Sequence, residues 1–138
     1  MRAETGRAAK TETGATVLVV EDDPSVRSLV TTLLGELGYR TLAAESGAEA
    51  LDVVNAHDGD IHMLLSDTVM PGMSGPELAQ QLRESLPELR VLLTSGYADQ
   101  AKTVELPYAS FIAKPFTPTS LAQKISDVLS DTADAARG

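Results

Sequence analysis

The chain has 138 residues, of which 43% are hydrophobic and 22% charged, and its formal net charge is −9. This length and composition suit one globular domain with an aliphatic core. The excess of acidic residues argues against nucleic acid as a partner, because phosphate binding needs a basic surface. No apolar run approaches the roughly 20 residues that a membrane helix needs, and the absence of cysteine excludes disulfides and thiolate metal sites. We therefore expect a cytoplasmic protein without membrane insertion.

The two ends of the chain differ in composition from its middle. Residues 1–14 are rich in Ala, Thr, Gly and charged side chains without any periodicity, so we expect a flexible N-terminal tail. Residues 15–131 form the expected domain, and residues 132–138 form a second flexible tail.

Short apolar runs alternate with helically spaced apolar residues along the expected domain. In chain order, the pattern predicts a strand at 16–20, a helix from Pro24 to Leu37, a strand at 39–44, a helix at 47–56, a strand at 61–66, a helix at 75–86, a strand at 90–95, a strand at 110–114 and a helix at 117–130. Residues 96–110 show no clear pattern, and any helix there is expected to be short or irregular. This alternation predicts a doubly wound α/β fold with a parallel sheet and helices on both faces.

Polar side chains follow several of the predicted strands. Glu21 and Asp22 come after the first strand and Asp67 after the third, while Ser95 ends the fourth and Lys114 the fifth. The carboxyl ends of parallel strands share one edge of the sheet, which is where such folds bind ligands. We therefore expect these side chains to converge.

Three converging carboxylates repel one another unless a cation neutralises them. Oxygen ligands in an incomplete set suit Mg²⁺, which commonly keeps waters and binds phosphoryl oxygen. A cation, an ammonium group and a hydroxyl around one carboxylate are what a phosphoryl group on that carboxylate requires. Taken singly, acids near strand ends have simpler explanations. The neighbouring Asp23 is expected to cap a helix that begins with Pro24, and a lone acid at a strand end is usually a turn former.

Four segments resemble the receiver domain of two-component response regulators: VLVVEDDPSVR, SDTVMPGMSGPEL, VLLTSGYA and FIAKPF. The resemblance runs from about Thr16 to Leu129 and is strongest to receivers fused to the C-terminus of hybrid sensor histidine kinases. It implies a flavodoxin-like (βα)5 fold with strand order 2-1-3-4-5. It also implies a cis Lys114–Pro115 bond.

The resemblance further implies a role for each matching residue. Asp67 would accept a phosphoryl group from a phosphohistidine on a histidine kinase or a histidine phosphotransfer protein. Mg²⁺, or Mn²⁺ in its place, would be bound by Asp67, Asp22, the main-chain carbonyl of Val69 and, through water, Glu21. The remaining roles are those of Ser95 as the switch hydroxyl, Lys114 as the partner of the phosphoryl oxygens and Phe111 as the aromatic switch.

A protein of this kind is not a turnover enzyme, although it promotes its own aspartyl phosphorylation and slow dephosphorylation. Val69 is apolar and Tyr97 is bulky, so nothing beside the acceptor is expected to orient a water, and we expect a long-lived acyl phosphate. The oligomeric state stays open between a monomer and a weak dimer that depends on phosphorylation.

Three alternatives compete with this interpretation. An aspartate-nucleophile phosphohydrolase would carry a second Asp at the position of Val69. A receiver-like interaction module that works without phosphorylation would be expected to have lost Asp67, Lys114 or the acidic pair. A nucleotide-binding flavodoxin-like protein would have a glycine-rich phosphate loop after the first strand, where this chain has acids.

Overall fold

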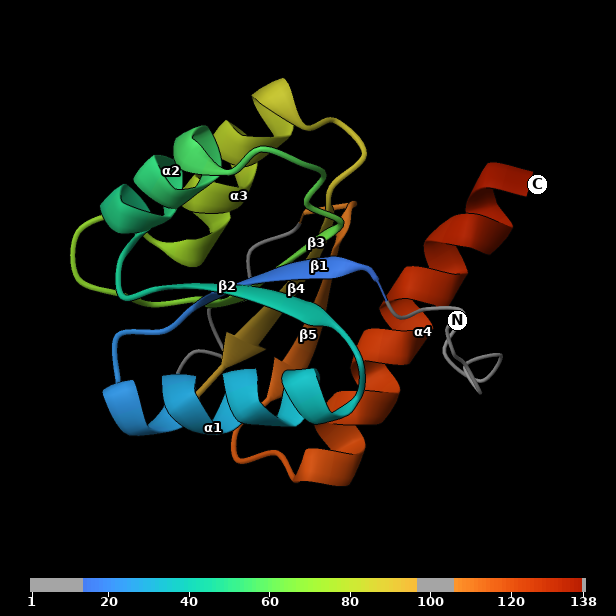
Figure 1. Ribbon diagram of the computed structural model, residues 1–138, viewed down its shortest axis with the longest axis horizontal. Helices are drawn as coiled ribbons and strands as arrows, with labels where there is room; N and C mark the ends of the chain where they lie inside the picture. Colours follow the sequence, from blue (N-terminus) through green and yellow to red (C-terminus); the bar gives the residue numbers. More distant parts are fainter. Residues whose placement is uncertain (1–13, 97–105, 138) are drawn as a thin grey trace.

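The computed structural model describes residues 14–96 and 106–137, with side chains described up to Ser130. A parallel sheet of five strands in the order β2-β1-β3-β4-β5 forms the middle layer (Figure 1). The strands are β1 (Thr16–Val20), β2 (Arg40–Ala44), β3 (Met63–Asp67), β4 (Arg90–Ser95) and β5 (Ala109–Ala113). The helices are α1 (Pro24–Glu36), α2 (Gly47–Ala56), α3 (Gly75–Ser85) and α4 (Pro118–Arg137).

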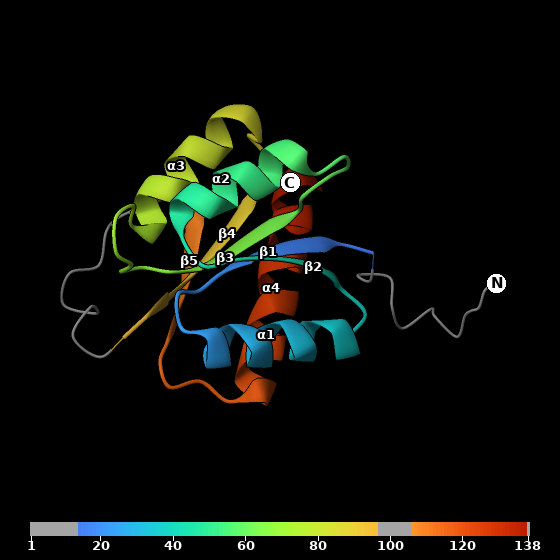
Figure 2. The same cartoon turned by 60° about the vertical axis from the view of Figure 1, so that its left-hand side comes forward.

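The helices cover the two faces of the sheet in pairs, with α2 and α3 on one face and α1 and α4 on the other (Figures 1 and 2). Alternate strand residues serve the two cores, as the pleat of a strand requires. The core beneath α1 and α4 takes Val17, Val19, Met63, Leu65 and Leu92 from the sheet. The core beneath α2 and α3 takes Leu18, Val20, Leu64, Val91 and Leu93.

Local signals in the sequence fix the starts of the helices that flank the site. The side chain of Asp23 accepts hydrogen bonds from the main-chain N–H groups of Ser25 and Val26, so Asp23 caps α1 as expected. At α3, Ser74 and Glu77 form a reciprocal capping box. With these caps, α1 begins four residues after the end of β1, and α3 begins eight residues after the end of β3.

The fold class and strand order expected from the sequence are confirmed. The ends of most elements agree within two residues, and the Lys114–Pro115 bond is cis. The expected end of the last helix at Ser130 is wrong, because α4 continues to Arg137 and most of the supposed C-terminal tail is helical. The three alanines after Asp131 favour a helix, and residues 131–137 contain no Gly or Pro that would end it.

Two expectations concern segments outside the described residues. These are the flexible tail, which apart from Gly14 falls in residues 1–13, and the short or irregular helix, most of which falls in residues 97–105. None of the described helices is long and apolar enough to cross a membrane.

Candidate functional site

The register of the sheet brings the polar residues at the strand ends to one edge, and four of them to one face. Asp67 is the last residue of β3 and lies opposite Thr94 of β4. Side chains two residues apart along a strand lie on the same face of the sheet. Glu21, Asp67 and Thr94 each come two residues after a strand residue that packs beneath α1 and α4. Lys114 likewise comes two residues after Ile112 of β5, which packs against the same core. These four side chains therefore extend one face of the sheet beyond its core.

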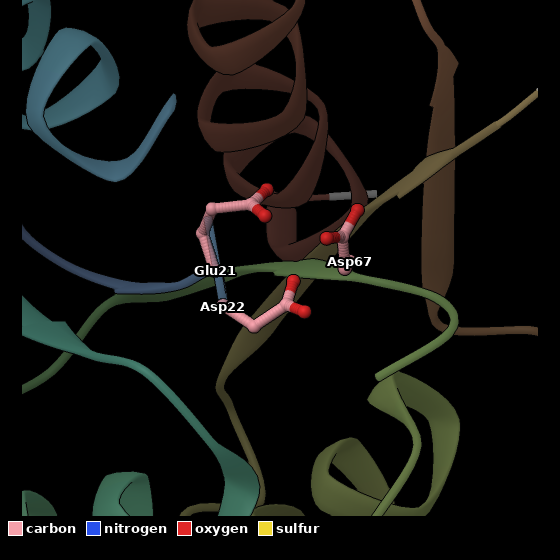
Figure 3. Close-up of side chains that lie close together, drawn as sticks. All are labelled: Glu21, Asp22 and Asp67. Atoms are coloured by element: carbon pink, nitrogen blue, oxygen red, sulfur yellow. The ribbon is translucent and has the colours of Figure 1, made fainter. Parts of the chain in front are cut away.

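Three carboxylates meet there. Glu21, Asp22 and Asp67 each offer an oxygen that lies within 4.8 Å of the others (Figure 3). Glu21 and Asp67 are only 6% and 7% exposed, whereas Asp22 is exposed to solvent. The convergence expected for these acids is thus present, and the cluster is open to solvent on the side of Asp22.

Lys114 places one positive charge against this cluster. Its Nζ atom lies 2.5 Å from Oδ1 of Asp67 and 3.5 Å from Oε1 of Glu21. Burial lowers the pKa of Lys114, but its hydrogen bond with Asp67 and the charges of both carboxylates outweigh this effect. The pKa of Lys114 therefore lies above its ordinary value of 10.5, and the group stays cationic at neutral pH.

A single ammonium group does not compensate three acids. The pKa of Glu21 is raised from 4.5 to about 7, with burial as the largest cause; the Asp23 N–H and Lys114 act to lower this pKa, and the nearby Asp67 acts to raise it. Burial at this edge thus disfavours the charged form of Glu21, and Lys114 alone does not offset that effect. A divalent cation bound by the carboxylates would supply the missing charge, so the donor set fits Mg²⁺.

Glu21 is longer than an aspartate, and its side chain folds back on the loop. Its Oε2 accepts a hydrogen bond of 3.0 Å from the main-chain N–H of Asp23. The guanidinium group of Arg27, on α1, donates to the carbonyl oxygen of Glu21 at 2.7 Å. These two bonds hold the loop after β1 in place, and Arg27 was not singled out from the sequence.

The hydroxyl that reaches the carboxylate of Asp67 among the described residues belongs to Thr94. Its Oγ1 donates to Oδ1 of Asp67 at 2.8 Å, and both side chains are buried. Sequence reasoning favoured Ser95 and passed over Thr94. Adjacent strand residues lie on opposite faces, so the register of β4 against β3 decides that Thr94, and not Ser95, lies on the face of Asp67.

Ser95 and Phe111 follow the other face of the sheet. Ser95 continues the alternation of Val91 and Leu93, and Phe111 packs against the core beneath α2 and α3. Ser95 is 7% exposed, and its carbonyl oxygen accepts the main-chain N–H of Lys114. Both residues thus lie on the face of the sheet opposite the carboxylate of Asp67.

Val69 lies two residues after Asp67 and is 61% exposed. Val69 therefore presents an apolar side chain to solvent close in sequence to the acceptor. Tyr97, the bulky residue that the sequence analysis also expected beside the acceptor, lies outside the described residues.

Comparison with known proteins identifies this arrangement. Residues 17–126 match the family described as "Response regulator receiver domain". The sensor kinase CckA of Brucella abortus is 38% identical over 118 residues, which are 83% of this chain and 12% of that protein. A chemotaxis protein CheY homolog of Campylobacter jejuni is 34% identical over 119 residues, which are 82% of this chain and 91% of that protein.

Solved structures agree with the sequence comparison. The receiver domain from the hybrid histidine kinase CckA superposes with a TM-score of 0.72 at 32% identity, covering 83% of this chain and 99% of that one. The response regulator TrrA of Thermotoga maritima, in complex with Mg²⁺ and BeF, gives a TM-score of 0.72 at 30% identity, covering 83% and 98%. The chain belongs to the receiver domain family of two-component signalling.

Proposed function

We propose that this chain takes a phosphoryl group from a phosphohistidine onto Asp67 in a reaction that depends on Mg²⁺. The observation that carries the proposal is the contact of Lys114 with Oδ1 of Asp67 inside a cluster of three carboxylates. A buried carboxylate with a cation at one oxygen and acidic metal ligands beside it suits attack on phosphorus.

The transfer needs one bond to form and one to break. An oxygen of the Asp67 carboxylate attacks phosphorus, the P–N bond of phosphohistidine breaks, and its electron pair remains on the imidazole nitrogen. Lys114, which contacts Oδ1 of Asp67, would pair with a phosphoryl oxygen. Glu21, Asp22, Asp67 and the carbonyl of Val69 would hold Mg²⁺, which would neutralise charge on the phosphoryl oxygens.

Phosphorylation then shifts a conformational equilibrium, in the manner of other charge-driven switches. We assign Ser95 and Phe111 to this step. Both follow the sheet face beneath α2 and α3, so a movement there carries the change away from the acid cluster. The chain itself is not a turnover enzyme.

The partner is a histidine kinase or a histidine phosphotransfer protein. The similarity to the CckA receiver supports a receiver of the hybrid-kinase type, and the CheY homolog supports a single-domain protein equally well. The alternatives draw less support from the site. A phosphohydrolase would place an acid where Val69 presents an exposed apolar side chain, and an interaction module would not need a lysine paired with a buried aspartate.

The test begins with acetyl phosphate and Mg²⁺, with phosphoprotein measured by intact mass. The wild-type chain is expected to gain one phosphoryl group, and Asp67→Asn or a chelator is expected to prevent it. Asp60→Asn, at an exposed acid away from the cluster, is the matched control and should be labelled normally. Phosphotransfer from a panel of histidine kinases and phosphotransfer proteins then identifies the partner. Labelling that survives in Asp67→Asn would show that another residue is the acceptor.

A further inference from the structure

We propose that Thr94 is a positioning residue for the phosphoacceptor, and that its hydroxyl shortens the lifetime of the acyl phosphate. This inference rests on the proposed function of Asp67. It concerns a hydroxyl on the face of β4 opposite that of the expected switch residue, Ser95.

The geometry fixes which oxygen of Asp67 is used. Lys114 and Thr94 both bind Oδ1, at 2.5 Å and 2.8 Å. Lys114 and Thr94 therefore engage the same oxygen, and we assign the attack on phosphorus to Oδ2. Once Oδ2 carries the phosphoryl group, Oδ1 becomes the carbonyl oxygen of the acyl phosphate.

The main chain at Thr94 is itself held in place. Asp67 and Thr94 are register partners on β3 and β4. Directly after them, the main-chain N–H and the side-chain hydroxyl of Thr68 both donate to the carbonyl oxygen of Thr94, each at 2.9 Å. All three residues are at least nine-tenths buried, so bulk water competes little for these bonds.

The chemistry of dephosphorylation gives the direction of the effect. Water attacks phosphorus, the bond between phosphorus and Oδ2 breaks, its electron pair returns to the carboxylate, and the water's proton leaves with inorganic phosphate. Negative charge develops on both carboxylate oxygens in this step. A hydroxyl donating to Oδ1 binds this charge more strongly than it binds a neutral carbonyl, so it stabilises the transition state over the acyl phosphate.

The same reasoning applies to the equilibrium. Hydrogen bonds to charged acceptors are stronger than those to neutral acceptors. Thr94 therefore stabilises the unphosphorylated carboxylate over its phosphorylated form. Removing the hydroxyl should raise the fraction of phosphorylated protein at a fixed concentration of phosphodonor.

The test uses the full chain, labelled with radioactive acetyl phosphate in Mg²⁺ and then freed of donor. In Thr94→Val, which keeps the shape of the side chain, we expect the half-life of the acyl phosphate to lengthen by about threefold to tenfold, because part of a charged hydrogen bond is lost from the transition state. Thr94→Ser keeps the hydroxyl and should restore a lifetime close to wild type. If Thr94 had only a structural role, the lifetime would not lengthen in Thr94→Val and return in Thr94→Ser while the melting temperatures of both variants stayed unchanged.

Thr68→Val is the matched control. It removes a neighbouring buried hydroxyl that binds a main-chain carbonyl, and the main-chain bond of Thr68 to the same carbonyl remains. Its lifetime should stay near wild type. Thr94→Ala provides a second variant without the hydroxyl should the valine fail to fold.

The outcomes separate this inference from the proposed function. Failure of the wild-type chain to be labelled would overturn the assignment of Asp67 and the inference with it. Normal labelling, with lifetimes in Thr94→Val and Thr94→Ala that equal or fall below wild type, would overturn the role of Thr94 alone. An equal lengthening in Thr68→Val would also overturn it, because the effect would then not depend on the carboxylate contact.

Discussion

The ammonium group of Lys114 lies 2.5 Å from Oδ1 of Asp67 and is the cation described closest to the acid cluster. Its side chain is 31% exposed, so solvent screens part of its interaction with the carboxylates. This ion pair opposes the repulsion among three acids that the fold gathers at one edge.

Replacing Lys114 by Met should therefore destabilise the metal-free protein. We expect the free energy of unfolding to fall by about 1–2 kcal/mol, because Asp67 and Glu21 lose the cation between them and screening limits the loss. Thermal melting measures the change, with Lys124→Met on α4 as a control of the same chemistry. Mg²⁺ should recover part of the loss, since it neutralises the same carboxylates. An unchanged melting temperature would mean that Lys114 contributes nothing to the stability of the resting state.

The raised pKa of Glu21 makes stability depend on pH in an unusual direction. Between pH 4.5 and about 7 the folded state keeps a proton on Glu21 that the unfolded chain has released. The folded state thus binds more protons, so the stability of metal-free protein falls as pH rises through this range. The loss contributed by Glu21 is complete above pH 7 and amounts to at most about 3 kcal/mol.

Urea unfolding of metal-free protein at several pH values checks this prediction. Glu21→Gln should flatten the dependence between pH 4.5 and 7 and should be more stable than wild type at pH 8, because the amide carries no charge there. Glu84→Gln, at an exposed position of α3, is the control and should follow the wild-type curve. A Glu21→Gln protein with the wild-type slope would place the pH dependence elsewhere.

Much of this site could be predicted from sequence because its position follows from topology. Apolar runs located the strands, and in a parallel sheet the residues after them meet at one edge. Glu21, Asp22, Asp67 and Lys114 were therefore brought together in the expectation as they are in the structure. Such reasoning needs only the order and direction of the strands.

Thr94 escaped the same reasoning because its role depends on register. Thr94 and Ser95 are adjacent hydroxyl residues at one strand end, and the sequence alone does not say which lies opposite Asp67. A shift of one residue exchanges the faces of a strand. The contacts of Arg27 and Thr68 with main-chain carbonyls were likewise out of reach, because they depend on how the loop after β1 and the ends of β3 and β4 are placed.

Val69 leads to a prediction about the lifetime of the phosphorylated state. Its side chain is apolar and 61% exposed beside the acceptor, so it offers no hydrogen bond to a water that attacks phosphorus. We expect the acyl phosphate to persist for minutes or longer without a phosphatase. Val69→Asn should shorten this lifetime, because an amide can orient the attacking water. Loss of label is measured after the donor is removed, and a wild-type half-life of seconds would contradict the prediction.

Gly75 at the start of α3 lies against the main chain of Asp67. A Cβ atom added there would overlap the carbonyl oxygen of Asp67, and the N–H of Gly75 donates to the carbonyl of Thr68. Gly75→Ala must therefore displace either α3 or the end of β3, and overpacking of this kind typically costs about 1–3 kcal/mol. We expect a lower melting temperature together with slower phosphorylation of Asp67. Gly35→Ala is the matched control, because its added Cβ meets nothing within 4 Å and lies inside α1. Replacing a helical glycine by alanine should stabilise the protein by about 0.5–1 kcal/mol, so the two substitutions should move the melting temperature in opposite directions. A Gly75→Ala protein that melts and labels like wild type would show that α3 can move away from Asp67 without cost.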